Sequence, residues 1–122
     1  MNKWVSISAV LGALAVIMGA FGAHGLQGRV EEKAIEWVRT GAHYQLTHAL
    51  ALLGWALWRQ HSGQESTIPG WGFLVGTLIF SGTLYAMTLG APRWFGAITP
   101  IGGSLLIGAW LVFAWQALNS SP

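Results

Sequence analysis

The sequence predicts an all-α membrane protein with four transmembrane helices. Hydrophobic residues make up 53% of the 122-residue chain and charged residues only 8%, whereas an average soluble domain has about 25% charged residues. Four long segments lack Asp, Glu, Lys and Arg over most of their length, and polar stretches separate them. Because so few charges cannot cover a water-facing surface, we expect lipid around most of a single integral-membrane domain over residues 1–122.

The first predicted span covers residues 4–26, which is more than the roughly 20 residues needed to cross a hydrocarbon core about 30 Å thick. On a helical wheel one side is small: Gly12, Ala15, Gly19, Gly22 and Ala23. The opposite side is large: Val10, Leu11, Leu14, Ile17, Met18 and Phe21. Helices in lipid associate through small residues, so we expect the small side to face protein and the large side lipid. A secretory signal peptide is the alternative for this segment.

The second predicted span covers residues 41–58, and a short amphipathic helix over residues 30–40 is expected in the membrane interface before it. A lead-in to the second span and a solvated connector are the alternatives for residues 30–40. A leucine stripe on the second span is expected to face lipid: Leu46, Leu50, Leu53 and Leu57. The other side is expected to face the bundle and to receive the small side of the first span: Tyr44, Thr47, His48, Ala51 and Trp55.

The third and fourth predicted spans cover residues 69–90 and 97–118, and the tight turn at 91–96 makes them antiparallel neighbours. Gly76, Thr83 and Gly90 recur every seven residues, which is typical of a packed helix pair. Four spans place both termini on one side. The loops 27–40 and 91–96 hold most of the basic residues, so the positive-inside rule puts the termini on the non-cytoplasmic side.

The distribution of charge excludes several classes of function. None of the four spans contains Asp, Glu, Lys or Arg, and all four acids lie in loops. A proton-coupled exporter of this size is expected to carry a membrane-embedded carboxylate, and the spans contain none. Hydrolysis needs a buried acid–base pair, which the spans also lack. The chain has no cysteine, and its few basic residues are too scattered to bind nucleic acid. We therefore identify no catalytic residue and expect no enzyme.

The candidate ligand-binding residues are four polar side chains in or next to the first two spans: His24, Tyr44, Thr47 and His48. One interpretation is that His24 and His48 meet and bind a haem or a metal ion, since neutral imidazole is a common ligand. Another is that each forms a hydrogen bond between helices, and a third is a proton- or quinone-handling role. Two histidines without a third ligand are a weak metal signal, so we predict no metal site and no cofactor.

Four motifs in order resemble one family. They are Gly19–Leu26 (GAFGAHGL), Tyr44–Leu53 (YQLTHALALL), Phe80–Tyr85 (FSGTLY) and Ile98–Gly103 (ITPIGG). Together they are similar to the YgdD/YwdK-type membrane proteins, domain-of-unknown-function family 423, whose eukaryotic relatives are the transmembrane protein 256 group. The resemblance implies a small four-span protein of the bacterial inner membrane with no established activity. It transfers no catalytic residue.

The function that we expect is that of a non-enzymatic membrane component. It would contact membrane lipids and form a homo-oligomer or an accessory subunit of a larger membrane complex through its small-residue helix faces. The alternative is a carrier or channel for a small neutral or lipophilic molecule, such as a lipid or quinone, with a cavity lined by Tyr44, Thr47, His48 and His24. A bis-histidine haem or metal site is the third hypothesis.

Overall fold

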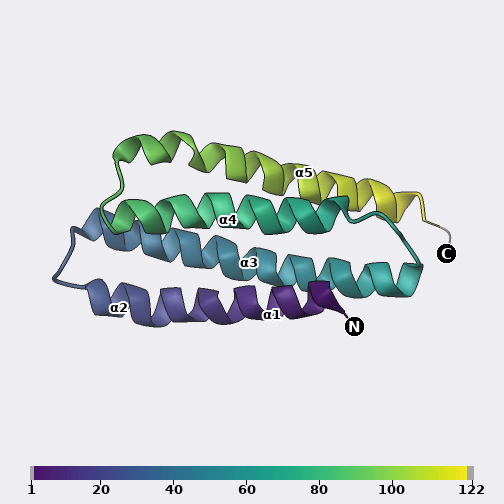
Figure 1. The fold of residues 1–122 in the computed structure, drawn as a ribbon, viewed down its shortest axis with the longest axis horizontal. Coiled ribbons are helices and arrows are strands. Elements are labelled where there is room, and N and C mark those ends of the chain that lie inside the picture. Colours follow the sequence, from purple (N-terminus) through teal and green to yellow (C-terminus); the bar gives the residue numbers. More distant parts are fainter. Residues whose placement is uncertain (1, 121–122) are drawn as a thin grey trace.

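The computed structural model describes residues 2–120, and within that range it consists of helices and the turns that join them. Residues 2–120 form four long helical rods. The first rod is α1 (Lys3–Val16), which continues through a π-helical segment, η1 (Ile17–Gly22), into α2 (Ala23–Leu26). The other elements are α3 (Glu32–Ser62), α4 (Ile68–Thr88), the 3₁₀ helix η2 (Arg93–Ala97) and α5 (Thr99–Leu118). Successive rods are antiparallel, and α1 begins at the end of the bundle where α5 ends (Figure 1).

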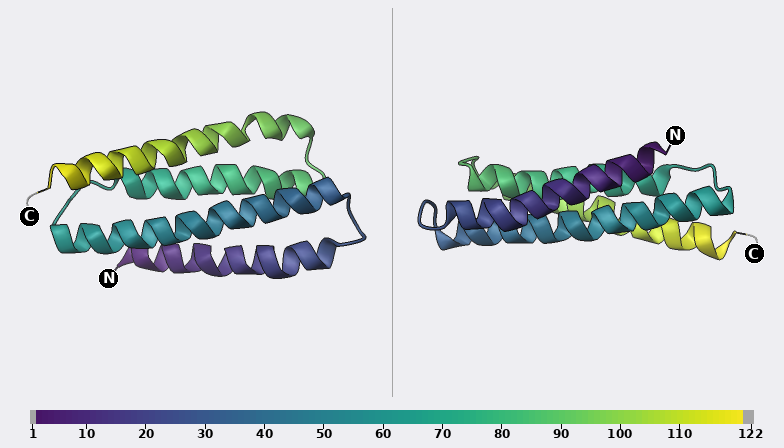
Figure 2. Two further views of the ribbon diagram at one scale, coloured as in Figure 1. Left: turned by 180° about the vertical axis from the view of Figure 1, so that it is seen from behind. Right: turned by 90° about the horizontal axis from the view of Figure 1, so that it is seen from below.

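The rods pack in the order α1, α3, α4, α5. The extensive contacts join α1 to α3, α3 to α4 and α4 to α5, so α1 and α5 are the outer helices. Two further views show the same neighbours from behind and from below (Figure 2). The main hydrophobic core lies around Leu52, Trp55 and Phe73, which are fully buried on α3 and α4. Helix α3 therefore has protein on two sides, whereas each outer helix has it on one.

The small side of the first span faces protein, as the sequence predicts. A Cβ atom placed on Gly19 would lie 3.4 Å from Cβ of Ala42, and one on Gly22 would lie 3.6 Å from Val38. Val10 and Phe21 on the large side are exposed. Leu11 is an exception to the prediction, because it is buried in the core although the wheel places it on the large side.

The prediction of where this small side docks is wrong. It packs on the face of α3 that carries Val38, Ala42 and Ala49, and not on the face of Tyr44, His48, Ala51 and Trp55. Small residues on both helices allow the close approach that stabilises helix pairs in lipid. The His48 face carries bulky aromatic neighbours and turns toward α4 and α5 instead.

The pairing of α4 with α5 follows the prediction. Cβ atoms on Gly72 and Gly76 would lie 2.8 Å from Ala109 and 2.9 Å from Leu106 on α5. The expected participation of Gly90 is wrong, since α4 ends at Thr88 and Gly90 lies in the following turn with φ of +109°. That left-handed conformation is the one that glycine adopts most readily.

Residues 30–40 do not form a separate helix. Helix α3 runs without a break from Glu32 to Ser62, so most of the segment expected in the interface is the start of α3. Its apolar side, with Ile35 and Val38, is buried against Ala23 of α2. Since protein already covers that side, it is not available to lie on lipid.

Three helical stretches are long and apolar enough to cross a membrane: Lys3–Leu26, Ile68–Thr88 and Arg93–Leu118. Helix α3 is not among them, although it packs against both α1 and α4. The polar residues that lower its hydropathy include Gln45 and His48, and both are buried inside the bundle.

Candidate functional site

His48 lies in the middle of α3 and joins three helices. Its ring is 6.0 Å, between centroids, from the ring of Phe73 on α4 and from that of Trp110 on α5. The side chain is only 6% exposed. Its Nδ1 lies 2.7 Å from the carbonyl oxygen of Tyr44, and the indole Nε1 of Trp110 donates to its Nε2 over 3.1 Å.

These two bonds define the protonation of the imidazole. An indole N–H can only donate, so Nε2 of His48 must be the unprotonated, accepting nitrogen. Nδ1 then carries the proton and donates it to the Tyr44 carbonyl. His48 is therefore a neutral imidazole with both nitrogens in use, and it links α3 to α5. To bind a metal through Nε2 it would have to lose the Trp110 bond.

A second polar group joins α1, α3 and α4. The amide nitrogen of Gln45 donates to the carbonyl of Leu11 over 2.9 Å, and the hydroxyl of Tyr85 donates to Oε1 of Gln45 over 2.7 Å. Gln45 is buried. Where no water competes, each such bond supplies a partner that a buried polar group requires, so Gln45 holds three helices at once.

Hydroxyl groups of α4 bind backbone carbonyls of α3. Ser81 donates to the carbonyl of Gly41 over 2.7 Å, and Thr88 donates to that of Ala34 over 3.1 Å. The ring of Tyr85 lies directly over Gly41, where a Cβ atom would come within 2.7 Å of it. Glycine at position 41 is thus what admits the tyrosine that reaches Gln45.

A few interior polar atoms have no partner among the described residues. They are Nε1 of Trp55, Nε of Arg59, Oγ1 of Thr77 and Oε1 of Gln116. None of these side chains is an acid or a base that transfers protons near neutral pH. Within residues 2–120 no group of three His, Cys, Asp or Glu side chains is arranged to hold a metal ion.

The structure does not bring the four predicted site residues together. Tyr44 lies next to His48, with the two rings nearly parallel, and it also contacts Phe80. His24 is exposed on α2, and Thr47 is exposed on α3. The expected cavity lined by these four residues stays a prediction.

Several residues of the interior were missed by the sequence analysis. Gln45 and Tyr85 carried a usable signal, because an amide and a phenol in uncharged spans require partners. Ser81 carried a weaker signal, since a serine hydroxyl can donate a hydrogen bond to a backbone carbonyl of its own helix. Trp110 carried no signal, because nothing in one sequence pairs its nitrogen with a histidine 62 positions away.

Over residues 2–120 the bundle is helical, its outer faces are apolar, and its hydrogen-bonded interior contains no Asp, Glu, Lys or Arg among the buried residues. These features define a small polytopic membrane protein. The chain belongs to the family described as "Protein of unknown function (DUF423)", whose model matches residues 18–103. The recognition made from the four motifs is thereby confirmed.

Relatives match over nearly the full length. The chain is 38% identical over 119 residues to a UPF0382 membrane protein of Haemophilus influenzae, covering 98% of this chain and 96% of the relative. It is 38% identical over 121 residues to YwdK of Bacillus subtilis, with 98% of each covered, and 35% identical over 118 residues to the inner membrane protein YgdD of Escherichia coli, with 92% and 86% covered. No solved structure matches. The protein is therefore an integral membrane protein of the inner, or plasma, membrane, and these names state no activity.

Proposed function

We propose that the protein is a non-enzymatic, four-span component of the membrane, and that its interior polar groups hold the bundle together. The supporting observation is the state of His48, the most reactive side chain of the interior, whose two nitrogens are both bound to protein groups. Gln45, Ser81 and Thr88 are engaged in the same way. Cross-helix hydrogen bonds of this kind contribute about 0.6–2 kcal/mol each in membrane proteins.

The fourth span in this proposal is α3. Its charged residues lie near its two ends, in the stretch up to Arg39 and again from Arg59 onward, and residues 41–58 carry none. The polar side chains between them, Gln45 and His48, are bound inside the bundle, so they do not expose unpaired groups to lipid. α3 also runs alongside α1 and α4 over their length (Figure 1). A helix that shares the depth of two membrane spans on either side of it crosses the same membrane.

The length of α3 supports the same arrangement. With 31 residues it is about 47 Å long at 1.5 Å per residue, against a hydrocarbon core about 30 Å thick. Its first turns, with Glu32, Glu36 and Arg39, then extend past the core into the headgroup region. This is where the expected interfacial segment lies in the proposal, as the beginning of a span and not as a separate helix.

Cysteine labelling tests the number of spans, because the native chain contains no cysteine. With four spans, Gln27→Cys and Glu65→Cys are labelled by an impermeant thiol reagent from opposite sides of the membrane. The same experiment measures orientation: Glu65→Cys is labelled from the non-cytoplasmic side if the termini lie there. Labelling of both variants from one side would overturn the four-span arrangement.

Association with other chains is the second part of this proposal. The glycines of α1, α4 and α5 that meet another helix, among them Gly12, Gly76 and Gly102, contact helices of the same chain, so a homo-oligomer or an accessory subunit would use the outer faces of α1 and α5. Crosslinking in native membranes, followed by identification of the products, tests it. A protein that yields only monomers at native expression, with crosslinkers that capture a known complex in the same membranes, would contradict this part.

Spectroscopy separates this proposal from a haem or metal site. The purified protein is expected to show no Soret band and no stoichiometric metal. A His48→Gln variant is expected to change stability and leave the spectrum unchanged. A Soret band that disappears in this variant would instead establish His48 as a ligand.

A further inference from the structure

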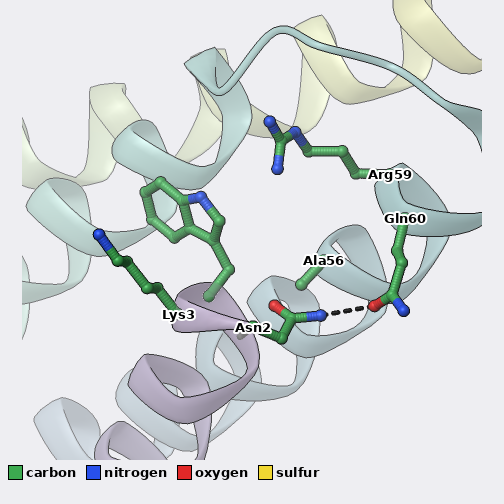
Figure 3. Close-up of a pocket in the computed structure, with 6 residues that line it drawn as sticks. Asn2, Lys3, Ala56, Arg59 and Gln60 are labelled. Atoms are coloured by element: carbon green, nitrogen blue, oxygen red, sulfur yellow. Dashed lines mark hydrogen bonds between the residues drawn. The ribbon is translucent and has the colours of Figure 1, made fainter.

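A polar hollow lies at the end of the bundle where α1 begins and α3 ends (Figure 3). It has a volume of about 450 Å³ and is lined by Asn2, Lys3, Trp4, Ala56, Arg59 and Gln60. The amide of Asn2 donates to that of Gln60 across the hollow. The lining contains two cationic side chains and no acidic one, so the hollow is positively charged.

Arg59 is held in place and still has free donors. One of its terminal nitrogens donates to the backbone carbonyl of Glu65 over 3.1 Å, and its guanidinium lies 5.8 Å from the ring centre of Trp55. Its Nε is buried and has no partner among the described residues. A guanidinium has five N–H donors in a fork that matches the oxygens of a phosphate, so most of its binding capacity is unused.

An apolar groove continues from this hollow along α1. Adjoining hollows share lining residues. Lys3 lines both the polar hollow and a second hollow, which Ile7 also lines. Ile7 in turn lines a third hollow of about 380 Å³ between α1 and α4. That last hollow is walled by Val10, Leu14, Leu74 and Leu78, among others. Lys3, Ile7, Val10 and Leu14 follow the i, i+4, i+7, i+11 spacing of one helical stripe. The groove therefore has a cationic head and an apolar body.

We propose that this groove binds an anionic phospholipid, with the phosphate at Lys3 and Arg59 and one acyl chain along α1 and α4. From Lys3 to Leu14 the helix rises about 16 Å, which is about half of a hydrocarbon core near 30 Å thick. The groove therefore has the depth of one leaflet. The inference rests on the proposed four-span arrangement, because Lys3 and Arg59 must reach the same membrane surface.

Tryptophans at the same end support the location of the headgroup. Trp4 packs edge-to-face on both Trp55 and Trp71, with ring centres 5.3 and 5.2 Å apart. Tryptophan gathers at the level of lipid headgroups. The cationic hollow, which Trp4 also lines, consequently lies at the depth where a phosphate is found.

Lipid binding to the purified full-length protein tests the inference. Dioleoyl phosphatidylglycerol is titrated against dioleoyl phosphatidylcholine, which has the same chains and no net charge, and retained lipid is counted by native mass spectrometry with thermal unfolding in parallel. The wild type is expected to prefer phosphatidylglycerol. Lys3→Gln and Arg59→Gln should each lower that affinity about fivefold, the contribution of one basic residue near an anionic surface.

Matched variants make the test specific. Lys33→Gln and Arg93→Gln remove the same charge at the opposite end of the bundle and should leave affinity unchanged. Val10→Trp fills the groove and should weaken binding, whereas Val16→Trp, on the same helix outside the groove, should not. Lys3 is exposed, so Lys3→Gln keeps the test open even if Arg59→Gln fails to fold.

Three results would overturn the inference. They are no preference for phosphatidylglycerol in the wild type, equal losses in the site and control variants, and equal stabilisation by inorganic phosphate alone. Labelling of Gln27→Cys and Glu65→Cys measures the number of spans without lipid titration. A failure of the lipid site is thus distinguishable from a failure of the four-span arrangement.

Discussion

The indole nitrogen of Trp110 donates a hydrogen bond to Nε2 of His48 across 3.1 Å, and this bond joins α5 to α3. The two helices have few other contacts, since α5 packs mainly on α4. On its own helix His48 uses Nδ1, which lies against the Tyr44 carbonyl. The bond from Trp110 therefore supplies the partner for the other ring nitrogen, Nε2.

Removing the indole donor should destabilise the bundle. Trp110→Phe keeps an aromatic ring beside Phe73 and leaves Nε2 of His48 without a partner, so we expect a loss of about 0.6–2 kcal/mol. Reversible unfolding in mixed micelles measures it. Trp115→Phe, at an exposed position on the same helix, is the control and should change little. Equal effects of the two substitutions would show that the bond contributes nothing.

The α4–α5 interface should not tolerate a methyl group at position 102. A Cβ atom on Gly102 would lie 2.5 Å from the backbone nitrogen of Phe80 and 2.8 Å from the carbonyl oxygen of Gly76. Backbone atoms cannot move aside as side chains do, so Gly102→Ala should force the helices apart at a cost of about 1–3 kcal/mol.

Gly108 provides the matched control on the same helix, since a Cβ atom there has no neighbour within 4 Å. Gly108→Ala should be neutral, or slightly stabilising, because alanine restricts the unfolded chain more than glycine does. Thermal unfolding of both variants in one detergent measures the difference. A Gly102→Ala protein as stable as Gly108→Ala would refute close packing at this point.

The two tyrosines of the chain allow a third comparison. Tyr85→Phe removes the hydroxyl that donates to Gln45 and leaves the amide oxygen of Gln45 buried without a partner. The expected loss is about 1–2 kcal/mol. Tyr44→Phe is the control, because the Tyr44 ring is partly exposed and its hydroxyl has no hydrogen bond among the described residues. Similar stability of all three proteins in unfolding experiments would be evidence against the Gln45–Tyr85 bond.

Much of the architecture follows from one-dimensional patterns. The helical fold and the small side of α1 were predicted from periodicity, and the antiparallel pairing of α4 with α5 was predicted from the tight turn at 91–96. Each of these depends on residues a few positions apart on one helix, or on a turn too short to allow another arrangement. Apolar length alone identified three spans, and α3 was predicted from its leucine stripe.

The face of α3 on which α1 docks, and the residues that form the polar interior, could not be predicted in the same way. A helical wheel shows that α1 has a small side, but not which side of α3 it meets, because Ala42 and Ala49 offer one small surface and Ala51 another. The pairing of His48 with Trp110 depends on the rotation of two helices that are distant in sequence. His24 and His48 were grouped because both are histidines near spans, and chemical likeness does not imply proximity.

The linear order of helix contacts has a consequence for how the chain is assembled. During synthesis α1 leaves the ribosome first, yet within residues 2–120 its extensive contacts with another span are those with α3, so it must remain in the bilayer without a neighbour until α3 is inserted. The bond from Gln45 to the Leu11 carbonyl forms only then. Helix α5 meets its main partner as soon as it is inserted, because α4 precedes it directly in the chain. A nascent chain arrested after α2 would therefore hold a single unpartnered helix, which insertases and quality-control proteases can still reach.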